Sequence, residues 1–297
     1  MTILSDKNLS LLPKERTAKE LTTIKCGGVC KNVFEPKSTA EFLSVIRALE
    51  NLGEKPFVLG GGSNVLVQDG EMQTPVVLTK HLDKIRIENG FAFAECGAKI
   101  SEILRRAREH NLGGLEFLAG VPLTLGGACK MNASAFGKQF FDLAEGVFVY
   151  ARAYDERDVC EYAHIIQVRK EDIDFGYRKG AEGIVVGAAI KLEKIDERKS
   201  VERARGFLEK RREKQPRGLS LGSVFKNGAQ PAGKTIEGCG LKGLKIGGAQ
   251  ISELHANFII NDGTATASDF LALVEICERE VEKKYNVKLE REFVLLR

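Results

Sequence analysis

Residues 56–67 read PFVLGGGSNVLV, so three glycines, a serine and an asparagine separate two apolar runs. The Val- and Leu-rich runs on either side predict strands at 56–60 and 64–68. A dinucleotide-binding fold needs a helix directly after its glycine-rich turn, and here a second strand follows instead. Because glycine tolerates positive φ, the N–H groups of the turn can face one side and hold an anion. The turn therefore predicts either an anion-binding connection between strands or a tight β-turn without a ligand.

A second glycine pattern, GCGLKG at 238–243, matches the dinucleotide fingerprint G-x-G-x-x-G by letters alone. That fingerprint needs a strand before it and a helix that opens directly after it. The chain continues here as LKIGGAQIS, with further glycines and no helical period. We therefore do not interpret the pattern as a nucleotide site.

The 297 residues are 43% apolar and 29% charged, with a net charge of +4. This is the composition of a soluble globular protein with one large domain or two ordinary ones. Positive residues are scattered, which favours small anionic ligands over nucleic acid. No apolar run approaches the roughly 20 residues of a membrane helix, and the opening MTILSDKNLS has no secretory pattern. We expect a cytoplasmic protein that binds neither nucleic acid nor membranes.

The chain has seven cysteines and no C-x-x-C motif. The odd number and the wide spacing argue against a disulfide framework and against a structural zinc site. We expect reduced thiols that are mostly buried as small hydrophobic side chains, and no bound metal.

The first part of the chain predicts a series of short elements. STAEFLSVIRALENLG begins with a capping box, Ser38 and Glu41, and carries apolar residues at helical spacing up to Gly53. Asn89-Gly90, between two alternating runs, is a strong hairpin signal. Strands are predicted at 56–60, 64–68, 75–79, 84–88 and 91–95, and a helix at about 100–111.

Strands near 145–152 and 184–192 complete a compact α+β unit that ends at about residue 193. The helix SVERARGFLEKRREKQ then ends at Pro216 and leads into a smaller α+β unit. That unit is predicted to hold a strand at 255–261, a helix at 267–285 and a final strand, VKLEREFVLL. Alternation puts Glu290 and Glu292 on one face of this strand and does not choose between them.

A second glycine-bearing loop, AGVPLTLGGA at 119–128, contains Thr124 and precedes the polar run MNASAFG. Two such loops in one unit could grip a diphosphate from both sides. An extended dinucleotide such as FAD would suit that arrangement.

Several motifs in fixed order now point to a family. They are TTIKCGG, EPKS, VLGGGSN, LEFLAGVPLTLGGACKMNASAFG, FGYR, GSVFKN, AGKTIEGCGLKG, KIGGAQISELHANFIIN and LEREF. Together they closely resemble the UDP-N-acetylenolpyruvoylglucosamine reductases, flavoenzymes of bacterial peptidoglycan precursor synthesis. The resemblance runs from about residue 21 to the end of the chain.

The resemblance implies an α+β fold with an FAD-binding unit of the vanillyl-alcohol-oxidase (PCMH) type at 21–193, after an N-terminal segment at 1–20. A smaller substrate-binding domain would follow at 194–297, with its last strand returning to the active site. FAD would be held non-covalently, since no histidine lies in the GGGSN turn. The implied cofactor-binding residues are Gly60, Gly61, Gly62, Ser63, Asn64, Gly120, Val121, Pro122, Thr124, Gly126 and Gly127.

The implied reaction reduces the enol ether of UDP-N-acetylenolpyruvoylglucosamine to UDP-N-acetylmuramate, with NADPH as the electron donor. Reduced FAD would pass hydride from N5 to the terminal enolpyruvyl carbon. Ser223 in GSVFKN matches the family's proton donor, and Arg178 in FGYR matches the arginine that contacts the substrate carboxylate. The family's essential glutamate aligns with Glu292, so Glu290 would be a solvated neighbour.

Plainer interpretations exist for these residues. Ser223 can be an ordinary turn residue, because a serine hydroxyl is a poor acid. Arg178 can form a structural ion pair with Asp172 or Asp174. A lone histidine at the start of an apolar strand, such as His255, is often structural.

The resemblance also implies contacts with the UDP-sugar and its phosphates. The chain departs from the family where Leu123 replaces a loop glycine and where MNASAFG replaces the commoner MNAGAYG. No insertion carries the substrate-capping tyrosine of the longer subtype, so the chain resembles the shorter subtype, and we expect a monomer. The implied substrate-binding residues are Tyr177, Lys214, Asn227 and His255.

Two other functions fit part of the pattern. An oxidase with the same FAD-binding fold would also contain the glycine turn, but GSVFKN and LEREF have no expected role there. A non-catalytic protein that binds a nucleotide sugar would have no need of Arg178, Ser223 and Glu292 together.

Overall fold

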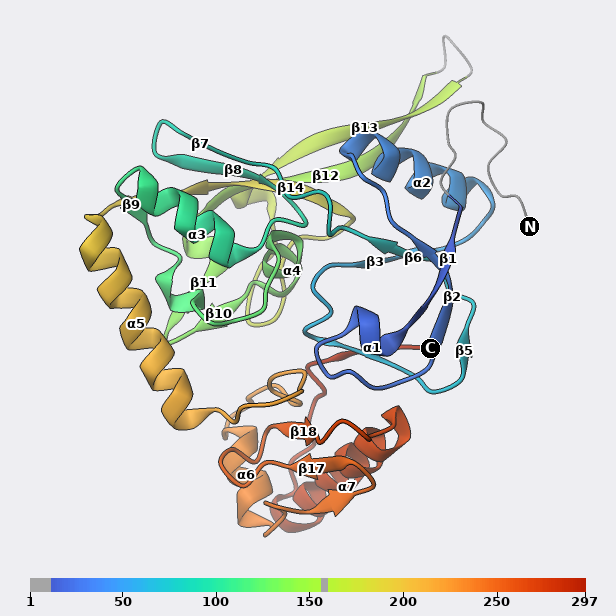
Figure 1. Ribbon diagram of the computed structural model, residues 1–297, viewed down its shortest axis with the longest axis vertical. Coiled ribbons are helices and arrows are strands. Elements are labelled where there is room, and N and C mark those ends of the chain that lie inside the picture. The colour runs from blue at the N-terminus through green and yellow to red at the C-terminus, as the bar shows by residue number, and fades with distance from the viewer. Residues whose placement is uncertain (1–11, 156–159) are drawn as a thin grey trace. The chain divides into compact units, whose positions relative to one another are not determined.

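The structure is a computed structural model that describes residues 12–155 and 160–297 (Figure 1). Residues 1–11 of the expected N-terminal segment lie outside the described residues. The described chain divides into two compact units, and neither is continuous in sequence. The first unit contains residues 12–14, 33–61 and 75–209, and the second contains residues 15–32, 62–74 and 210–297.

An antiparallel sheet forms the centre of the first unit, with the strand order β13-β12-β14-β8-β7. The turn between β7 and β8 has positive φ at both Asn89 (51°) and Gly90 (81°), as a tight hairpin turn requires. The predicted hairpin is therefore confirmed. The strands are β7 (Ile85–Glu88), β8 (Phe91–Glu95), β12 (Ala144–Asp155), β13 (Cys160–Arg169) and β14 (Val185–Lys191).

Two helices pack against this sheet, α3 (Ile100–Glu109) on β7 and β8, and α4 (Leu125–Met131) on β8 and β14 (Figure 1). The buried face of α3 carries Ile103, Leu104 and Ala107 at the spacing of one helical stripe. Burying each such aliphatic side chain contributes roughly 1.5–3 kcal/mol. This core fixes α4, and with it the loop that leads into α4.

A small parallel sheet also belongs largely to the first unit. In it β6 (Val76–Leu78) lies between β2 (Val29–Phe34) and β3 (Phe57–Leu59). Helix α2 (Thr39–Asn51) begins at Ser38, whose side chain accepts the Glu41 N–H. In a capping box the Glu41 carboxylate would accept the N–H of Ser38. Here it accepts the N–H of Lys37, one residue earlier.

The second unit has its own core around α7 (Ala267–Tyr285), whose predicted bounds are confirmed. An antiparallel sheet of β16 (Lys245–Ile246), β17 (Ala249–Ile251) and β18 (Ile259–Asn261) packs on α7, as does α6 (Ala232–Gly238). Strand β4 (Val65–Val67) pairs in parallel with the last strand, β19 (Val294–Leu296). The chain directly after the GGGSN turn is thereby joined to the C-terminal end of the protein.

Two expected strands are shorter than predicted. The strand expected at 255–261 begins only at Ile259, because Phe258 donates its N–H to the His255 carbonyl in a turn. Of the expected strand VKLEREFVLL, only Val294–Leu296 belongs to β19. The preceding residues run as an extended segment with an isolated bridge from Arg291 to Phe225. The alternation of apolar residues predicted which side chains face the core. It did not predict which residues pair with a neighbouring strand.

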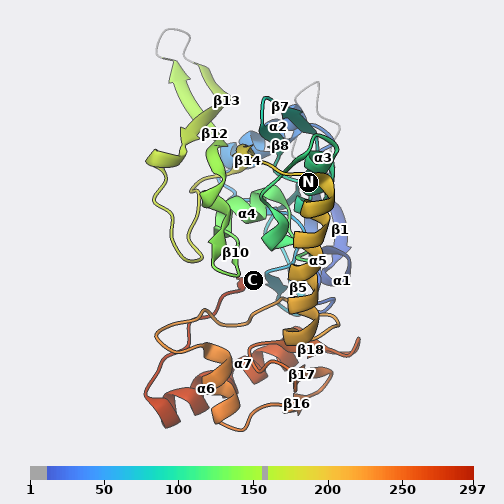
Figure 2. The ribbon, with the colours of Figure 1, turned by 90° about the vertical axis from the view of Figure 1, so that its left-hand side faces the viewer.

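The remaining elements are short, except for the long helix α5 (Figure 2). They are β1 (Lys14–Thr17), α1 (Ala18–Leu21), β5 (Glu71–Met72), β9 (Leu112–Gly113), β10 (Ser134–Ala135), β11 (Lys138–Gln139), β15 (Glu193–Lys194) and α5 (Glu197–Lys214), with 3-10 turns at Glu116–Leu118, Phe140–Asp142 and Lys170–Asp172.

Five of the six cysteines whose side chains the structure describes are buried, as expected for small hydrophobic side chains. Burial raises the pKa of Cys26, Cys96 and Cys277 to about 12, so these thiols are not nucleophiles at neutral pH. Across 12–155 and 160–297, no helix combines the length and the hydropathy needed to span a membrane.

Candidate active site

The GGGSN turn offers a run of backbone donors. The N–H groups of Gly60, Gly61, Gly62 and Ser63 make no hydrogen bond to any other described residue. Gly62 has a φ of +63°, and a Cβ there would lie 2.0 Å from the carbonyl oxygen of Leu21, so only glycine fits. Consecutive unpaired N–H groups in a turn with positive φ are the donor set of an anion nest.

The second glycine-bearing loop meets this turn within the first unit. A Cβ on Gly60 would lie 2.4 Å from Thr124 Oγ1, and one on Gly61 would lie 3.5 Å from the Pro122 carbonyl oxygen. Thr124 is the N-cap of α4 and is buried. The predicted convergence of the two loops is therefore present, and glycine at position 60 is what allows the close approach.

The two loops do not offer equivalent donors. The N–H of Gly126 donates to the Cys96 carbonyl at 2.8 Å, and the N–H of Leu125 donates to Ala98. The N–H of Val121 is likewise used, by the Leu118 carbonyl. Gly126 packs closely, since a Cβ there would lie 3.1 Å from Cys96. The first turn of α4 is thus tied to the segment after β8, and the longest run of free donors at the site is that of the GGGSN turn.

Two other glycines of this loop, Gly120 and Gly127, differ in their local setting. Gly120 is exposed at a φ of +81°, a conformation that favours glycine. Gly127 has its N–H 3.5 Å from Thr124 Oγ1, a long capping contact. Any contact of these glycines with a cofactor would depend on the backbone path rather than on side chains.

These observations fit the pyrophosphate of FAD. An anion nest neutralises a diphosphate with N–H dipoles and needs no lysine. The glycines at positions 60 and 62 let the turn pack against Thr124 and Leu21, while the N–H groups of the turn stay unused within the described residues. The residues present are therefore suited to hold FAD at the turn, with Pro122 and Thr124 beside it.

Arg178 lies at the tip of a tight turn in the first unit. Gly176 and Lys179 exchange two backbone hydrogen bonds of 2.9 and 3.2 Å, and Arg178 between them has a φ of +58°. This left-handed conformation costs an ordinary residue roughly 1–2 kcal/mol. Such strain is found at sites where a side chain must point in a set direction.

The plainer interpretation of Arg178 does not match the observed ion pairs. Asp172 pairs with Arg169 at 3.2 Å, and Asp174 pairs with Lys179. The guanidinium of Arg178 instead donates from Nη1 to Ser134 Oγ at 3.1 Å. Its carbon Cζ also lies 5.3 Å from the ring centre of Tyr177, which is about half exposed.

Sequence reasoning missed Asn132, which is fully buried at the end of α4. Its Nδ2 donates to the Gly176 carbonyl at 3.0 Å and to Gln139 Oε1 at 2.9 Å, while its Oδ1 accepts the Phe141 N–H. The side chain therefore holds the Arg178 turn against α4. The polar run MNASAFG was the available signal in the sequence. It indicated that this segment is unusual, but not that it contacts the turn that carries Arg178.

In the second unit the structure brings Ser223 and Glu292 together. The Glu292 N–H donates to the Val224 carbonyl at 2.8 Å, and Ser223 forms an isolated bridge with Phe258. Asn64 of the GGGSN turn donates from Nδ2 to the Glu292 carbonyl at 3.0 Å. Its own carbonyl accepts the Val294 N–H at 2.9 Å. The turn, the serine segment and the C-terminal segment are thus neighbours.

The two candidate acids differ in their surroundings. Glu290 has a side chain that is 72% exposed and pairs with Lys226. Glu292 is half-buried and lies beside Asn64. A solvated ion pair is worth little, whereas a half-buried carboxylate can interact strongly with a ligand.

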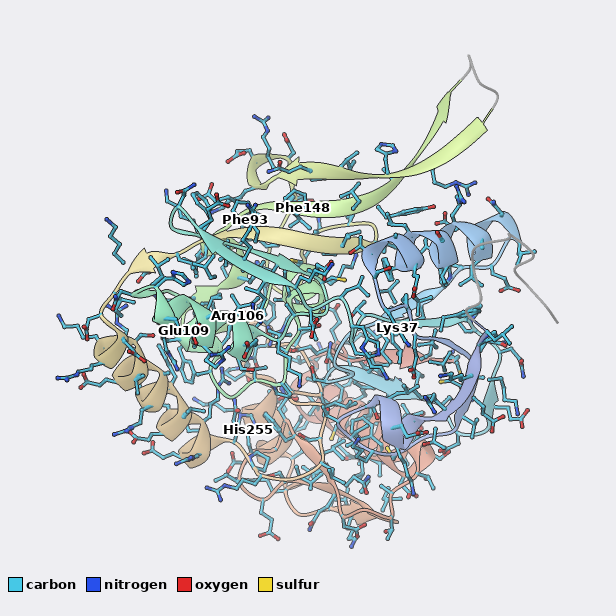
Figure 3. The ribbon with its side chains drawn as sticks, turned by 45° about the horizontal axis from the view of Figure 1, so that its top comes forward. Lys37, Phe93, Arg106, Glu109, Phe148 and His255 are labelled. Carbon is cyan, nitrogen blue, oxygen red and sulfur yellow. The ribbon has the colours of Figure 1, made fainter. Side chains whose placement is uncertain are left out.

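The histidine His255 is partly buried in the second unit (Figure 3). Burial lowers the pKa of His255, and its Nδ1 accepts the Asn257 N–H at 3.2 Å. This hydrogen-bond arrangement assigns the proton of the neutral ring to Nε2. His255 is therefore a neutral donor at pH 7, close to Gly233 at the start of α6.

Asn227 and Lys214 are both exposed. The Asn227 side-chain oxygen accepts the Ala232 N–H at 3.1 Å, which caps α6. Lys214 is the last residue of α5, so its ammonium lies at a helix C-terminus.

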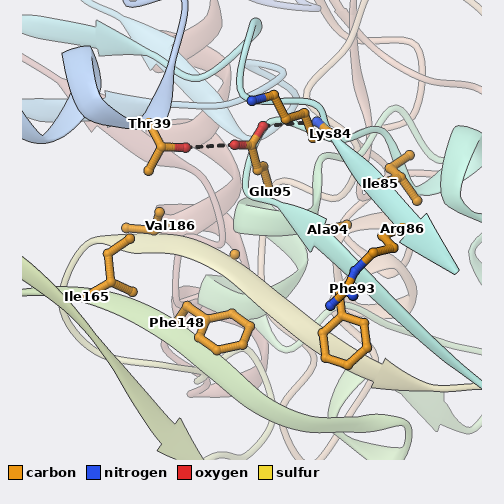
Figure 4. Close-up of a pocket in the computed structure, with 11 residues that line it drawn as sticks. Thr39, Lys84, Ile85, Arg86, Phe93, Ala94, Glu95, Phe148, Ile165 and Val186 are labelled. Atoms are coloured by element: carbon orange, nitrogen blue, oxygen red, sulfur yellow. Dashed lines mark hydrogen bonds between the residues drawn. The ribbon is translucent and has the colours of Figure 1, made fainter. Parts of the chain in front are cut away.

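A pocket of about 380 Å³ lies on the sheet of the first unit (Figure 4), and none of the predicted site residues lines it. Phe93 and Phe148 form its apolar floor, on the face opposite Ala92 and Val147 of the core. Glu95 accepts hydrogen bonds from Thr39 Oγ1 at 2.7 Å and from the Lys84 N–H at 3.0 Å. This pocket does not contain the donors of the glycine turn.

Comparisons with known proteins agree with this geometry. A sequence model described as an FAD binding domain matches residues 30–158, and one described as the C-terminal domain of UDP-N-acetylenolpyruvoylglucosamine reductase matches residues 214–296. With the α+β fold and the glycine turn, the first match places the chain among FAD-dependent oxidoreductases.

Relatives along nearly the whole chain narrow the assignment. The reductase of Chloroherpeton thalassium is 38% identical over 93% of this chain and 90% of its own length. That of Thermotoga petrophila is 38% identical over 91% and 94%. The solved reductase of Thermus caldophilus superposes with a TM-score of 0.79 at 30% identity, covering 97% of this chain and all of the other. The chain belongs to the UDP-N-acetylenolpyruvoylglucosamine reductase family.

Proposed function

We propose that this protein reduces the enol ether of UDP-N-acetylenolpyruvoylglucosamine to UDP-N-acetylmuramate, with NADPH as the electron donor. Full-length similarity to reductases named for this substrate supports the reaction. The observation that carries the assignment to particular residues is the backbone bond from Glu292 to Val224, which sets Glu292 beside Ser223. In this proposal, residues 21–193 would bind the cofactor, and residues 194–297 would bind most of the substrate.

When bound, FAD would take hydride from NADPH and give it from N5 to the terminal enolpyruvyl carbon. Negative charge then develops at the carbon that bears the substrate carboxylate. This chain must supply a cation for that charge and a proton to quench it.

Arg178 would bind the substrate carboxylate. A guanidinium can fork onto a carboxylate with two parallel N–H bonds and stays charged at every working pH. The fixed turn of Gly176 to Lys179 would hold it in place before the substrate arrives, so that little reorganisation is needed.

Ser223 would donate the proton from its hydroxyl. A serine is a poor acid, so the site must exclude water and stabilise the transient alkoxide. Glu292, half-buried beside the serine segment, is the acid that we assign to the reaction. Glu290, exposed and paired with Lys226, would have no part in it.

The nucleotide part of the substrate would meet the second unit. Lys214 offers a positive charge for a phosphate, and Asn227 offers an amide beside the start of α6. His255 would donate from Nε2 as a neutral ring, since its Nδ1 already accepts a backbone N–H. Tyr177, next to Arg178, would pack on the sugar or the enolpyruvyl group.

A monomer working in the cytoplasm completes the proposal. The composition and net charge are those of a soluble enzyme with small anionic substrates.

An anaerobic titration followed by visible absorbance tests the proposal. NADPH should bleach the flavin of the purified protein, and UDP-N-acetylenolpyruvoylglucosamine should then restore the oxidised spectrum. Bleaching without recovery would retain the flavoprotein and reject the substrate, and oxygen would then be tried as the acceptor. Failure to take up FAD at all would contradict the assignment of the glycine turn.

The Ser223→Ala variant tests the proton donor. Flavin reduction by NADPH should be nearly unchanged, because that half-reaction needs no proton from the protein at the substrate carbon. Reoxidation by the enol ether should fall by about 100-fold or more, the range of a lost proton donor. Equal loss in both half-reactions would show that the serine has a general structural role instead.

A further inference from the structure

The turn that carries Arg178 is attached to α4 at both of its ends. Before the arginine, the Asn132 side chain donates to the Gly176 carbonyl. After it, the Ala181 N–H donates to the Cys129 carbonyl at 3.0 Å. A Cβ on Gly180 would lie 1.8 Å from that same carbonyl oxygen, so the approach requires glycine. The backbone of Arg178 is thus fixed by main-chain bonds and by one buried amide.

A fixed backbone does not by itself fix the end of an arginine side chain, which has several rotatable bonds. The guanidinium is held by a separate contact, the bond from Nη1 to Ser134 Oγ at 3.1 Å. Ser134 lies 44 residues earlier in the chain, in the strand β10.

The hairpin that carries Ser134 is itself well anchored. Ser134 pairs with Gln139 of β11, and Gln139 Oε1 accepts a bond from the buried Asn132 at 2.9 Å. At the tip of the hairpin, Phe136 packs on Phe207 of α5 with ring centres 5.0 Å apart. The Ser134 hydroxyl therefore sits on a rigid support and is not needed to form the hairpin.

We propose that Ser134 is a positioning residue for Arg178, and that it orients the guanidinium toward the carboxylate of the enol ether substrate. The inference rests on the proposed function, because it takes from there the role of Arg178. It adds to the candidate site a residue that the motifs of the sequence did not assign.

The geometry of the bond explains why it would assist binding. A guanidinium can fork onto a carboxylate through Nε and Nη2 or through Nη1 and Nη2, and Nε of Arg178 is buried. Ser134 accepts one of the two N–H groups of Nη1, so the bond uses one of the five N–H donors of the guanidinium. The hydroxyl can therefore hold the plane of the guanidinium without competing with the substrate. The entropy cost of ordering the arginine side chain then falls on folding and not on substrate binding.

The Ser134→Ala variant removes the hydroxyl and leaves the hairpin backbone unchanged. We expect reoxidation of the reduced flavin by the enol ether to slow by about tenfold, the effect of losing one hydrogen bond to a charged group. KM for the enol ether should rise, while flavin reduction by NADPH and FAD content stay unchanged. Ser134→Thr keeps a hydroxyl and should restore most of the rate.

A double-mutant cycle with Arg178→Ala shows whether Ser134 acts through Arg178. In the Arg178→Ala background, Ser134→Ala should change reoxidation by less than about twofold. Lys179→Ala is the matched control: it breaks the ion pair to Asp174 in the same turn without touching the guanidinium. It should leave the KM for the enol ether close to that of the wild type.

The outcomes separate the two proposals. If Arg178→Ala leaves reoxidation by the enol ether intact, the proposed function loses its carboxylate ligand. If Arg178→Ala slows reoxidation but Ser134→Ala has no effect, only the positioning role is overturned. An equal loss from Ser134→Ala in both half-reactions, or additive effects in the cycle, would also overturn it.

Discussion

Single glycines set the closest contacts at the GGGSN turn. Gly60 touches Thr124, Gly62 touches Leu21, and each contact leaves no room for a methyl group. Their neighbour Gly61 has more space, with 3.5 Å to the nearest atom. The requirement for glycine is therefore strictest at the two outer positions of the triplet, and these should tolerate substitution least.

Gly60→Ala should lower the affinity for FAD while the protein stays folded. The new methyl group would meet Thr124 Oγ1 at 2.4 Å, and the shift that relieves the clash costs about 1–3 kcal/mol. Equilibrium titration of stripped protein with FAD should show a loss of about tenfold or more. Gly206→Ala, on α5 with no atom within 4 Å of the new Cβ, is the control and should bind FAD normally. Equal affinities in both variants would contradict the close approach at Gly60.

Replacing each glutamate of LEREF by glutamine shows which of the two takes part in the reaction. Glu292→Gln should slow flavin reoxidation by the enol ether by about 100-fold, since removing an essential acid or base has effects of that size. Glu290→Gln should stay within about twofold, because it removes only an exposed pair with Lys226. Stopped-flow absorbance under anaerobic conditions measures both. The reverse order would assign the reaction to Glu290.

Sequence reasoning reached Arg178, Ser223 and Glu292 through motifs, and the structure places Ser223 and Glu292 on neighbouring segments. It could not reach Asn132 or Ser134 as residues that hold Arg178. Both act across 44 residues of chain, and a hydrogen bond between distant segments leaves no periodic trace in a single sequence. Only the unusual serine in MNASAFG indicated that something differs there.

At the scale of elements, the sequence predicted best those helices and turns whose bounds depend only on residues close together in the chain. The apolar stripe of α7 and the Asn89-Gly90 turn gave correct bounds, because both depend on neighbours in sequence. The strands β18 and β19 were overpredicted, since their ends depend on partners elsewhere. The β4–β19 pair brings together segments that are more than two hundred residues apart, as the 228 residues between Asn64 and Glu292 show.

The start of α7 is also capped from a distant segment. The Asp69 carboxylate accepts the N–H groups of Ala267 and Ser268 at 3.0 and 2.8 Å, and the Ser268 hydroxyl at 2.7 Å. Burial alone would raise the pKa of Asp69, but these hydrogen bonds together lower it below 3.8. A negative charge here also interacts favourably with the helix dipole.

Asp69→Ala should lower the free energy of unfolding by about 1–2 kcal/mol at pH 7, as loss of a helix cap does. A carboxyl group with a depressed folded pKa contributes stability above its unfolded pKa. The contribution is lost as the pH falls through the folded pKa. The difference between wild type and variant should therefore shrink below about pH 4. Urea denaturation at a series of pH values measures it, with Asp83→Ala, an exposed aspartate, as the control. A difference that persists undiminished at pH 2 would contradict the role of the charge.

At the scale of the molecule, the second unit is assembled from three separate stretches of chain. Its core contains Ile24, Cys26 and Leu66 together with residues of α7. Asn261 donates to the Ile24 carbonyl at 2.7 Å, and β19 has β4 as its strand partner. The sequence model that matches residues 214–296 therefore covers only part of the folded unit, which extends beyond it.

A fragment of residues 210–297 alone should not unfold cooperatively. It would expose the core surface that Ile24, Cys26 and Leu66 cover, and burying each large aliphatic side chain contributes roughly 1.5–3 kcal/mol. It would also leave β19 as an unpaired edge strand. Because whole domains are stable by only about 5–15 kcal/mol, these losses should be enough to unfold it. A chain that joins 15–32, 62–74 and 210–297 through glycine–serine linkers restores every stretch and should fold. Urea denaturation followed by circular dichroism compares the two, and a sharp transition in the short fragment would show that the C-terminal residues form a domain by themselves.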